Sequence, residues 1–354
     1  MAKEQEKLLS ITQLFLFCAS FLITLGLLKA ASEVIVPFLI SLAVAIIFSP
    51  LFTFLESKKI PKIVSLVFVL SFMLLPLSIA SSYIADEIKD FTQHYHIIKE
   101  QFMQHLYSYI EKLYGYGIEF SYEQIKDFLQ RIDVAGFFKK LIAQANNQFS
   151  NIFLIIFMVA FMLVESDIFH KKMIAISQRY DIDTAVISEI IEKVKSYFII
   201  KMKTSMLTGF LVFLVLWYFH IKYSLVLAVI AFLFNFIPVV GSIIAAIPAV
   251  LLALLQYDML HMFMVTGGYL IINVLVGNIL EPRIMGKGLG LSALVIFLSM
   301  TFWGWMFGPT GMILSVPLTM TLQYLFAQYP ETKWVAILLS DEVGIEKEQK
   351  KLKP

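Results

Sequence analysis

The sequence predicts an all-α integral membrane protein with about eight transmembrane helices, one or two re-entrant hairpins broken by proline and glycine, and an extramembrane helical arm. Hydrophobic residues make up 59% of the 354 residues and charged residues 15%, against roughly 45–50% and 25% in soluble domains. Uncharged runs recur at the length of about 20 residues that crosses a bilayer core. A net charge of +2 and a mean hydropathy of +0.81 argue against a soluble enzyme, a disordered chain or a nucleic-acid binder.

The first 167 residues contain four of these runs. Three of them, Leu8–Leu28, Val34–Leu55 and Ile63–Ala85, form a predicted unit of three N-terminal spans over residues 8–85. The fourth run, Gln144–Val164, supplies a fourth span over residues 149–167. The single cysteine, Cys18, lies inside the first run, which excludes an intrachain disulfide and a four-cysteine zinc site.

Lysine and arginine are concentrated in the short segments between spans, and the side that holds them is expected to be cytoplasmic. They follow the second span, the Met259–Leu280 span and the last span, and seven of them lie between Glu165 and Lys203 (Lys171, Lys172, Arg179, Lys193, Lys195, Lys201 and Lys203). Placing these groups inside puts both termini, including the tail at 331–354, in the cytoplasm.

Residues 86–148 are then an extracytoplasmic arm. An apolar stripe at helical spacing from Ile84 to Leu113 predicts a long helix, and Tyr114–Gly117 marks a turn before a second helix returns to the membrane. We expect a helical hairpin that takes part in oligomer contacts. Three histidines on the arm (His94, His96 and His105) lack a carboxylate or cysteine at ligand spacing, so no metal site is expected there.

A basic amphipathic helix over residues 168–203 is expected on the cytoplasmic side, and it leads into a C-terminal transport core over residues 204–330. That core contains two uncharged runs longer than one span: Tyr223–Tyr257 with 35 residues and Gly288–Pro330 with 43. Each run is interrupted, at 236–241 and at 307–311, by a Phe–Pro–Gly pattern that a further proline follows. Paired breaks of this kind point to the substrate site of a transporter.

The first break is predicted to form a re-entrant hairpin, with two short tilted spans as the alternative. The second break is either re-entrant or two full spans. The candidate pathway residues lie in and beside these breaks, because unpaired polar groups are costly within a membrane. They are Asn235, Pro238, Gly241, Ser242, Pro248, Asn273, Asn278, Glu281, Gly308, Pro309, Gly311, Ser315, Pro317 and Thr319.

Glu281 is the only carboxylate near the breaks in sequence, and Arg283 is expected to neutralise it. Asn278 precedes Glu281 by three residues, so the two are expected to share a helix face. Ser315, Thr319 and Gln323 form a polar stripe that suits either a cavity or helix packing. Glu281 can be a helix-end charge or a site for a proton or cation, and the asparagines can equally be interhelical hydrogen-bond partners.

The sequence contains no phosphate-binding loop, no His-Glu-x-x-His motif and no Gly-x-Ser-x-Gly motif. No aspartate falls inside an uncharged run, as an intramembrane aspartyl protease would require. We therefore expect no enzymatic activity, and no cofactor or metal.

Three blocks of the C-terminal half resemble the autoinducer-2 exporter family of permeases. They are Asn235-Phe-Ile-Pro-Val-Val-Gly241 with Ile247-Pro248, then Asn278-Ile-Leu-Glu-Pro-Arg-Ile-Met-Gly286, and Phe307-Gly-Pro-Thr-Gly-Met-Ile-Leu-Ser-Val-Pro317. The resemblance covers most of the chain, but the arm is poorly matched. It implies a homo-oligomeric permease of the bacterial inner membrane. Some members are described as exporters of autoinducer-2 and others as sodium/proton antiporters.

The sequence thus leads to three hypotheses. The first is a secondary transporter that exports a small polar solute by alternating access, with the two breaks forming the solute site. The alternative is a sodium/proton antiporter that uses Glu281. The third is a membrane scaffold that assembles partners through its arm, and a pure anchor would need only intact helices.

Overall fold

The computed structural model describes residues 2–115, 136, 152–169, 171–172, 175–176, 185–285 and 290–341. Within these ranges the chain is helical and contains no strand, which confirms the all-α prediction. Among the described residues, six helices are long and apolar enough to cross a membrane, which confirms an integral membrane protein. The expected total of about eight spans stays a prediction.

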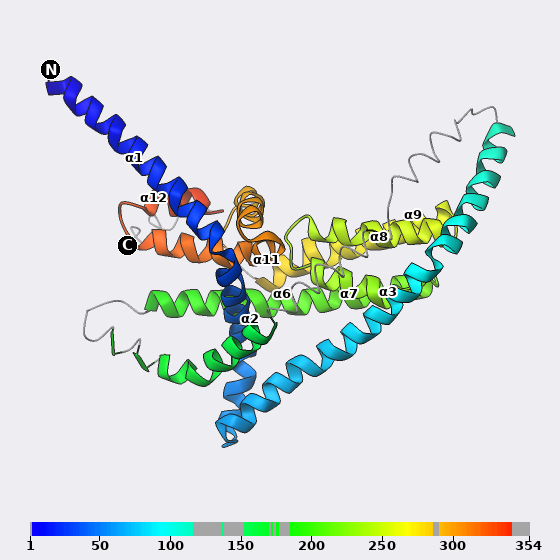
Figure 1. Cartoon of the computed structure of the whole chain (residues 1–354), viewed down its shortest axis with the longest axis horizontal. Helices are drawn as coiled ribbons and strands as arrows, with labels where there is room; N and C mark the ends of the chain where they lie inside the picture. The colour runs from blue at the N-terminus through cyan, green and yellow to red at the C-terminus, as the bar shows by residue number, and fades with distance from the viewer. Residues whose placement is uncertain are drawn as a thin grey trace, which may run out of the picture.

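The N-terminal half begins with α1 (Ala2–Ala30) and α2 (Ser32–Ser57), which a single residue separates. Next comes α3 (Lys62–Gly115), a helix of 54 residues that extends about 80 Å at 1.5 Å per residue. Figure 1 shows α3 running past the ends of α8 and α9. A further helix covers Ile152–Phe169, where the fourth span was expected.

The C-terminal half is built around α6 (Ala185–Tyr218), which is unbroken over 34 residues. Residues 185–203 of the expected amphipathic helix and the span that follows them are therefore one element, with no interruption at 203–204. The remaining helices follow in order: α7 (Ser224–Phe234), α8 (Gly241–Gln256), α9 (Met259–Ile272), the π-helix η1 (Asn273–Leu280), α10 (Glu281–Met285), α11 (Ala293–Gln328) and α12 (Lys333–Leu339).

The first break turns the chain back on itself. Helices α7 and α8 pack against each other, and two hydrogen bonds close their far ends: the Lys222 N–H donates to Gln256 Oε1 at 2.9 Å, and the Tyr257 hydroxyl donates to the His220 carbonyl at 3.0 Å. These contacts define a helical hairpin, here called hairpin 1, with its tip at Asn235–Val240. At about 16 and 24 Å, its two arms are shorter than the bilayer core.

The second break also folds back, because α11 consists of two helical halves that meet at a kink. The Trp303 indole N–H donates to Thr319 Oγ1 at 3.0 Å, whereas 16 residues of straight helix would span about 24 Å. The Gln323 amide donates to the Gly290 carbonyl at 2.6 Å and joins the far ends. Gly308, at φ 65° and ψ −150°, is the non-helical residue between the two halves. We call residues 290–328 hairpin 2.

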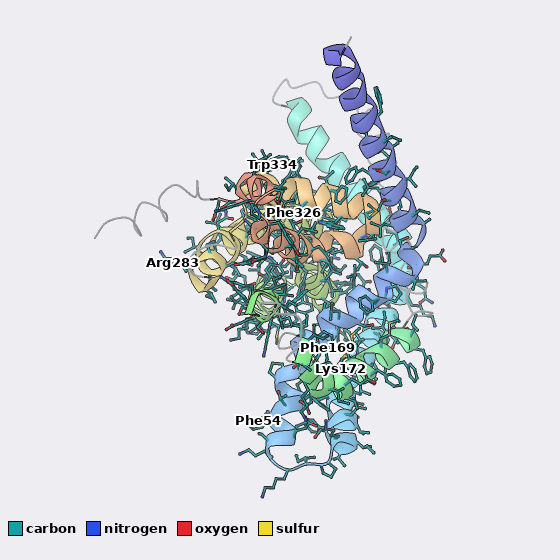
Figure 2. All side chains as sticks on the ribbon, turned by 90° about the vertical axis from the view of Figure 1, so that its left-hand side faces the viewer. Phe54, Phe169, Lys172, Arg283, Phe326 and Trp334 are labelled. Carbon is teal, nitrogen blue, oxygen red and sulfur yellow. The ribbon has the colours of Figure 1, made fainter. Side chains whose placement is uncertain are left out.

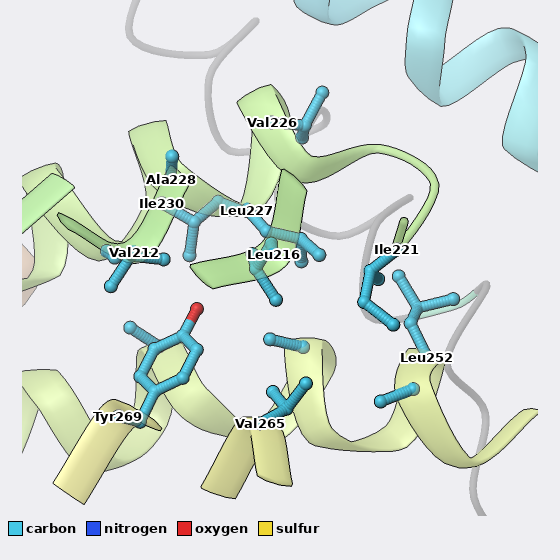
Figure 3. Close-up of a cluster of buried hydrophobic side chains, with 14 of the residues drawn as sticks. Val212, Leu216, Ile221, Val226, Leu227, Ala228, Ile230, Leu252, Val265 and Tyr269 are labelled. Atoms are coloured by element: carbon cyan, nitrogen blue, oxygen red, sulfur yellow. The ribbon is translucent and has the colours of Figure 1, made fainter. Parts of the chain in front are cut away.

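Two buried clusters hold these hairpins against α6. The C-terminal half of α6 packs with α7, α8 and α9 around Val212, Leu216, Leu227, Leu252 and Val265, all 0% exposed (Figure 3). The N-terminal half of α6 packs through Tyr197 and Phe198 on hairpin 2 and on α2. Helix α6 is therefore the element that both hairpins share.

The first part of the apolar stripe on the arm packs against this core. Ile88 and Phe91 of α3 are buried in the α6–α9 cluster. The Phe91 ring meets the Tyr223 ring edge-on at 5.4 Å, and the Tyr223 hydroxyl donates to Asp90 Oδ2 at 2.9 Å. The returning helix that was expected to partner the stripe falls on residues outside the described ranges, so the helical-hairpin arm stays a prediction.

Asp258 provides a local test of how α9 begins. Its carboxylate caps the helix by accepting from the backbone N–H of His261 at 2.9 Å. That bond, with a second from the His261 ring, holds the pKa of the Asp258 carboxyl below its usual range. We expect Asp258→Ala to lower the free energy of unfolding by about 1 kcal/mol, measured by thermal unfolding in lipid nanodiscs.

The cap also has a pH dependence whose sign follows from the lowered pKa. The stabilisation is complete above the unfolded-state pKa near 3.8, and it is lost as the pH falls through the lower folded-state value. Asp258→Asn keeps a capping oxygen and serves as the control. It should retain most of the stability but lose this part of the acid sensitivity. An equal loss in both variants would contradict the capping role.

Candidate functional site

A buried polar face on α6 lies where hairpin 1 and α10 meet this helix. Lys201, Thr204, Ser205 and Thr208 are 6%, 1%, 0% and 7% exposed. Their spacing of three, one and three residues places them on one side of the helix. Polar and charged side chains are seldom this buried without a partner, so each needs an explanation.

Lys201 forms an ion pair with Glu281 at the start of α10. The Lys201 ammonium lies 2.7 Å from Glu281 Oε1, and the two side chains are 8% and 15% exposed. The Thr204 hydroxyl donates to the other carboxylate oxygen, Oε2, at 3.3 Å. Two oxygens of one carboxylate therefore hold adjacent turns of α6, and the charges neutralise each other within the protein.

The tip of hairpin 1 reaches the same face one residue further along. The Asn235 amide donates to Ser205 Oγ at 2.9 Å, and both side chains are buried. Asn235 lies at the C-terminal end of α7, immediately before the turn of the hairpin. Two of the predicted pathway residues, Asn235 and Glu281, are thus brought to adjacent positions on α6, although 46 residues separate them in sequence.

Both hairpin tips depend on glycine for a close backbone approach. A Cβ on Gly241 would overlap the Phe234 carbonyl, and a Cβ on Gly311 would overlap the Trp303 carbonyl. The same Cβ atoms would also lie 3.1 Å from Ile237 Cβ and 3.0 Å from Phe307 Cβ, in each case four residues earlier. The two breaks are therefore alike in structure as well as in sequence.

Each tip also contains one residue with positive φ. In hairpin 2 it is Gly308, and in hairpin 1 it is Val239 at φ 61°. The Val240 N–H donates to the Pro238 carbonyl at 2.6 Å across Val239. A β-branched residue in this region is strained, and such residues persist only where the surroundings impose the conformation. Strain of this kind is common at functional sites.

The prolines and Ser242 of the candidate set have structural positions in the hairpins. Pro248 and Pro317 are buried within α8 and the second half of α11. Pro238 is half-buried and Pro309 exposed at the two tips, and Ser242 is half-buried in the first turn of α8. These residues shape the hairpins, and none of them lies among the contacts that join Asn235 and Glu281 to α6.

Other predicted site residues lie elsewhere. Asn278 is exposed while Glu281 is largely buried, so the expected shared face is not formed. The reason is the π-helix over Asn273–Leu280, whose wider turns shift the register that a spacing of three assumes. Arg283 is exposed and projects at the edge of the molecule (Figure 2), so Lys201 rather than Arg283 neutralises Glu281. Asn273 is half-buried.

The polar stripe of hairpin 2 has a packing role. The Ser315 hydroxyl donates to the Met312 carbonyl of its own helix at 2.7 Å. Thr319 and Gln323 make the bonds to Trp303 and Gly290 that hold the two halves together. Of the two functions left open for this stripe, the hydrogen bonds favour helix packing.

Sequence reasoning missed the α6 residues. The sequence predicts Lys201 among the basic residues of the cytoplasmic side, and it predicts no role for Thr204 beyond the start of the transport core. A usable signal was nevertheless present, since Lys201, Thr204, Ser205 and Thr208 recur at helical spacing. Among the described residues no group of three or more metal-ligating side chains is found.

The comparisons with known proteins agree on one protein family. The sequence model described as AI-2E family transporter matches residues 11–331. The AI-2 transport protein TqsA of Escherichia coli K12 is 33% identical over 314 residues, which cover 89% of this chain and 91% of that protein. A relative from Haemophilus influenzae, whose name refers to transport without giving a solute, is 35% identical over 340 residues, or 94% and 97% of the two chains. The chain therefore belongs to the AI-2E family of membrane transporters.

Proposed function

We propose that this transporter exports a small polar solute of the autoinducer-2 type by alternating access, as a secondary transporter. One observation supports this most strongly: the tip of hairpin 1 and Glu281 meet on the buried polar face of α6. Broken helices that bring polar groups together in this way are typical of transporter substrate sites. The name of the TqsA relative supplies the solute class.

The orientation in the membrane that we propose follows from the distribution of lysine residues, and two contacts support it. With both termini cytoplasmic in a bacterial inner membrane, Asp90 is extracytoplasmic, and its bond to Tyr223 supports an open end of hairpin 1 on that side. The Lys29 ammonium, at the outer end of α1, lies 4.0 Å from the centre of the Trp305 ring near the tip of hairpin 2. Hairpin 2 then opens from the cytoplasm, so the two re-entrant hairpins enter from opposite sides.

The domain organisation that we propose keeps the sequence boundaries, with the N-terminal spans at 8–85, the arm at 86–148 and the transport core at 204–330. The long α3 and its contact with hairpin 1 make the arm a candidate for contacts in a homo-oligomer. Segment 168–203 begins on the cytoplasmic side in this proposal, and its residues 185–203 join the core as the first half of α6. Sodium/proton exchange through Glu281 alone would require a cation to displace the Lys201 ammonium. Solute export is therefore better supported than sodium/proton antiport.

The experiment is transport in proteoliposomes containing the purified full chain. Liposomes loaded with autoinducer-2 should release it saturably and faster than protein-free liposomes when the protein is present. Release no faster than from protein-free liposomes would contradict export of this solute class. Sodium-driven proton movement without solute movement would instead favour the antiporter.

A further inference from the structure

Two buried hydroxyl groups lie at the two ends of the polar face of α6, and neither has a hydrogen-bond partner. They belong to Tyr197 and Thr208, whose side chains are 3% and 7% exposed. A buried hydroxyl group without a partner costs about 1–3 kcal/mol, so these two groups need an explanation. The contacts of the described residues do not provide one.

The two hydroxyls are on the same face as the residues that are paired. Taking 100° per residue, Tyr197, Lys201, Thr204, Ser205 and Thr208 fall within an arc of about 100° on α6, over a length of about 16 Å. Tyr197 precedes Lys201 by about one turn. Thr208 follows Ser205 by three residues. One polar track therefore runs along the helix.

The polar side chains in the middle of this track have hydrogen-bond or ion-pair partners, whereas the hydroxyl groups at its two ends have none. Lys201 and Thr204 are bridged to Glu281, and Ser205 is bridged to Asn235 at the tip of hairpin 1. Beyond these bridges, on either side, stand the unpaired hydroxyls of Tyr197 and Thr208. Tyr197 packs among residues of hairpin 2, and Thr208 lies one turn before Val212, which belongs to the cluster that contains hairpin 1.

We infer that the two bridges form a gate across the transport path, and that the Tyr197 and Thr208 hydroxyls are solute subsites on its opposite sides. This inference rests on the proposed function. A hydroxyl group can donate and accept, so each subsite takes a hydroxyl or carbonyl oxygen of a small solute. The ion pair in the gate is electrically balanced and leaves no net charge for an ionic solute. The solute breaks the bridges as it passes from one hydroxyl to the other.

The test uses variants that remove only the hydroxyl: Tyr197→Phe and Thr208→Val. Their controls are Tyr269→Phe, which removes another unpaired buried hydroxyl, but one pointing into the apolar cluster (Figure 3), and Thr266→Val, whose hydroxyl bonds its own helix at Met262. Uptake of autoinducer-2 is measured in proteoliposomes of known orientation, with solute added from either side, together with the unfolding temperature.

We expect Tyr197→Phe to raise the half-saturating solute concentration about 5- to 10-fold from the cytoplasmic side, and Thr208→Val to do so from the other side, since one hydrogen bond is lost. Neither variant should lower the unfolding temperature, because an unpaired buried group is removed, and the controls should transport as wild type. Wild-type transport by either subsite variant would overturn the inference. A loss of transport accompanied by a lower unfolding temperature would overturn it as well. Failure of the wild-type protein to transport would instead contradict the proposed function.

Discussion

Replacing Gly241 or Gly311 with alanine is expected to abolish transport. The added methyl group would overlap the carbonyl oxygen of Phe234 in the first case and of Trp303 in the second. Backbone atoms cannot move aside as the end of a flexible side chain can, so the tip of the hairpin must open. We expect a loss of several kcal/mol in the free energy of unfolding, in the upper range for single substitutions.

Gly267→Ala is the matched control, because a Cβ at this position meets nothing within 4 Å. It makes the same chemical change inside α9 and should leave transport and the unfolding temperature nearly unchanged. Measurements of transport in proteoliposomes and of thermal unfolding in nanodiscs distinguish the cases. Normal activity of Gly241→Ala and Gly311→Ala would show that neither tip requires the close approach seen here.

Breaking the ion pair from one side is expected to be nearly as damaging. Lys201→Met leaves the Glu281 carboxylate buried without its cation, and Glu281→Gln leaves the Lys201 ammonium without its anion. An uncompensated buried charge costs about 3–5 kcal/mol. Each single variant should therefore unfold at a lower temperature and transport slowly.

The double variant separates stability from function. With Lys201→Met and Glu281→Gln combined, no charge is left unpaired, so much of the stability should return. Saturable transport should not return with it, because the bridge that closes the path between α6 and α10 is gone. Full transport by the stable double variant would show that the ion pair contributes to folding alone.

The two hairpins show why part of the site was predictable. The breaks were visible because proline and glycine interrupt runs that the bilayer requires to be uncharged. That the two breaks share one pattern was also visible, and the equivalent roles of Gly241 and Gly311 now give it a structural basis. Whether the chain folds back at the second break was not predictable, since this depends on the hydrogen bonds from Trp303 to Thr319 and from Gln323 to Gly290.

The contacts of Glu281 show what could not be predicted. Its partner Lys201 lies 80 residues earlier, and a lysine at the edge of an apolar run is more simply explained as a cytoplasmic charge. Asn278 was misplaced for a different reason: the helical period assumed for it fails within a π-helix. Pairing across the bundle and local changes of helical period both arise from tertiary packing, which one sequence alone does not specify.

The most direct test of the central claim, that hairpin 1 moves against α6 during transport, is a reversible cross-link between them. Ser205→Cys and Asn235→Cys are introduced together in a Cys18→Ser background, which removes the one native cysteine. Ser205 Oγ and Asn235 Nδ2 now lie 2.9 Å apart, so the two cysteines are neighbours, and formation of the disulfide under oxidation is verified by mass spectrometry before transport is measured. We expect oxidation to stop autoinducer-2 transport and reduction to restore it, while each single-cysteine variant is unaffected by either treatment. Undiminished transport by fully cross-linked protein would contradict the claim.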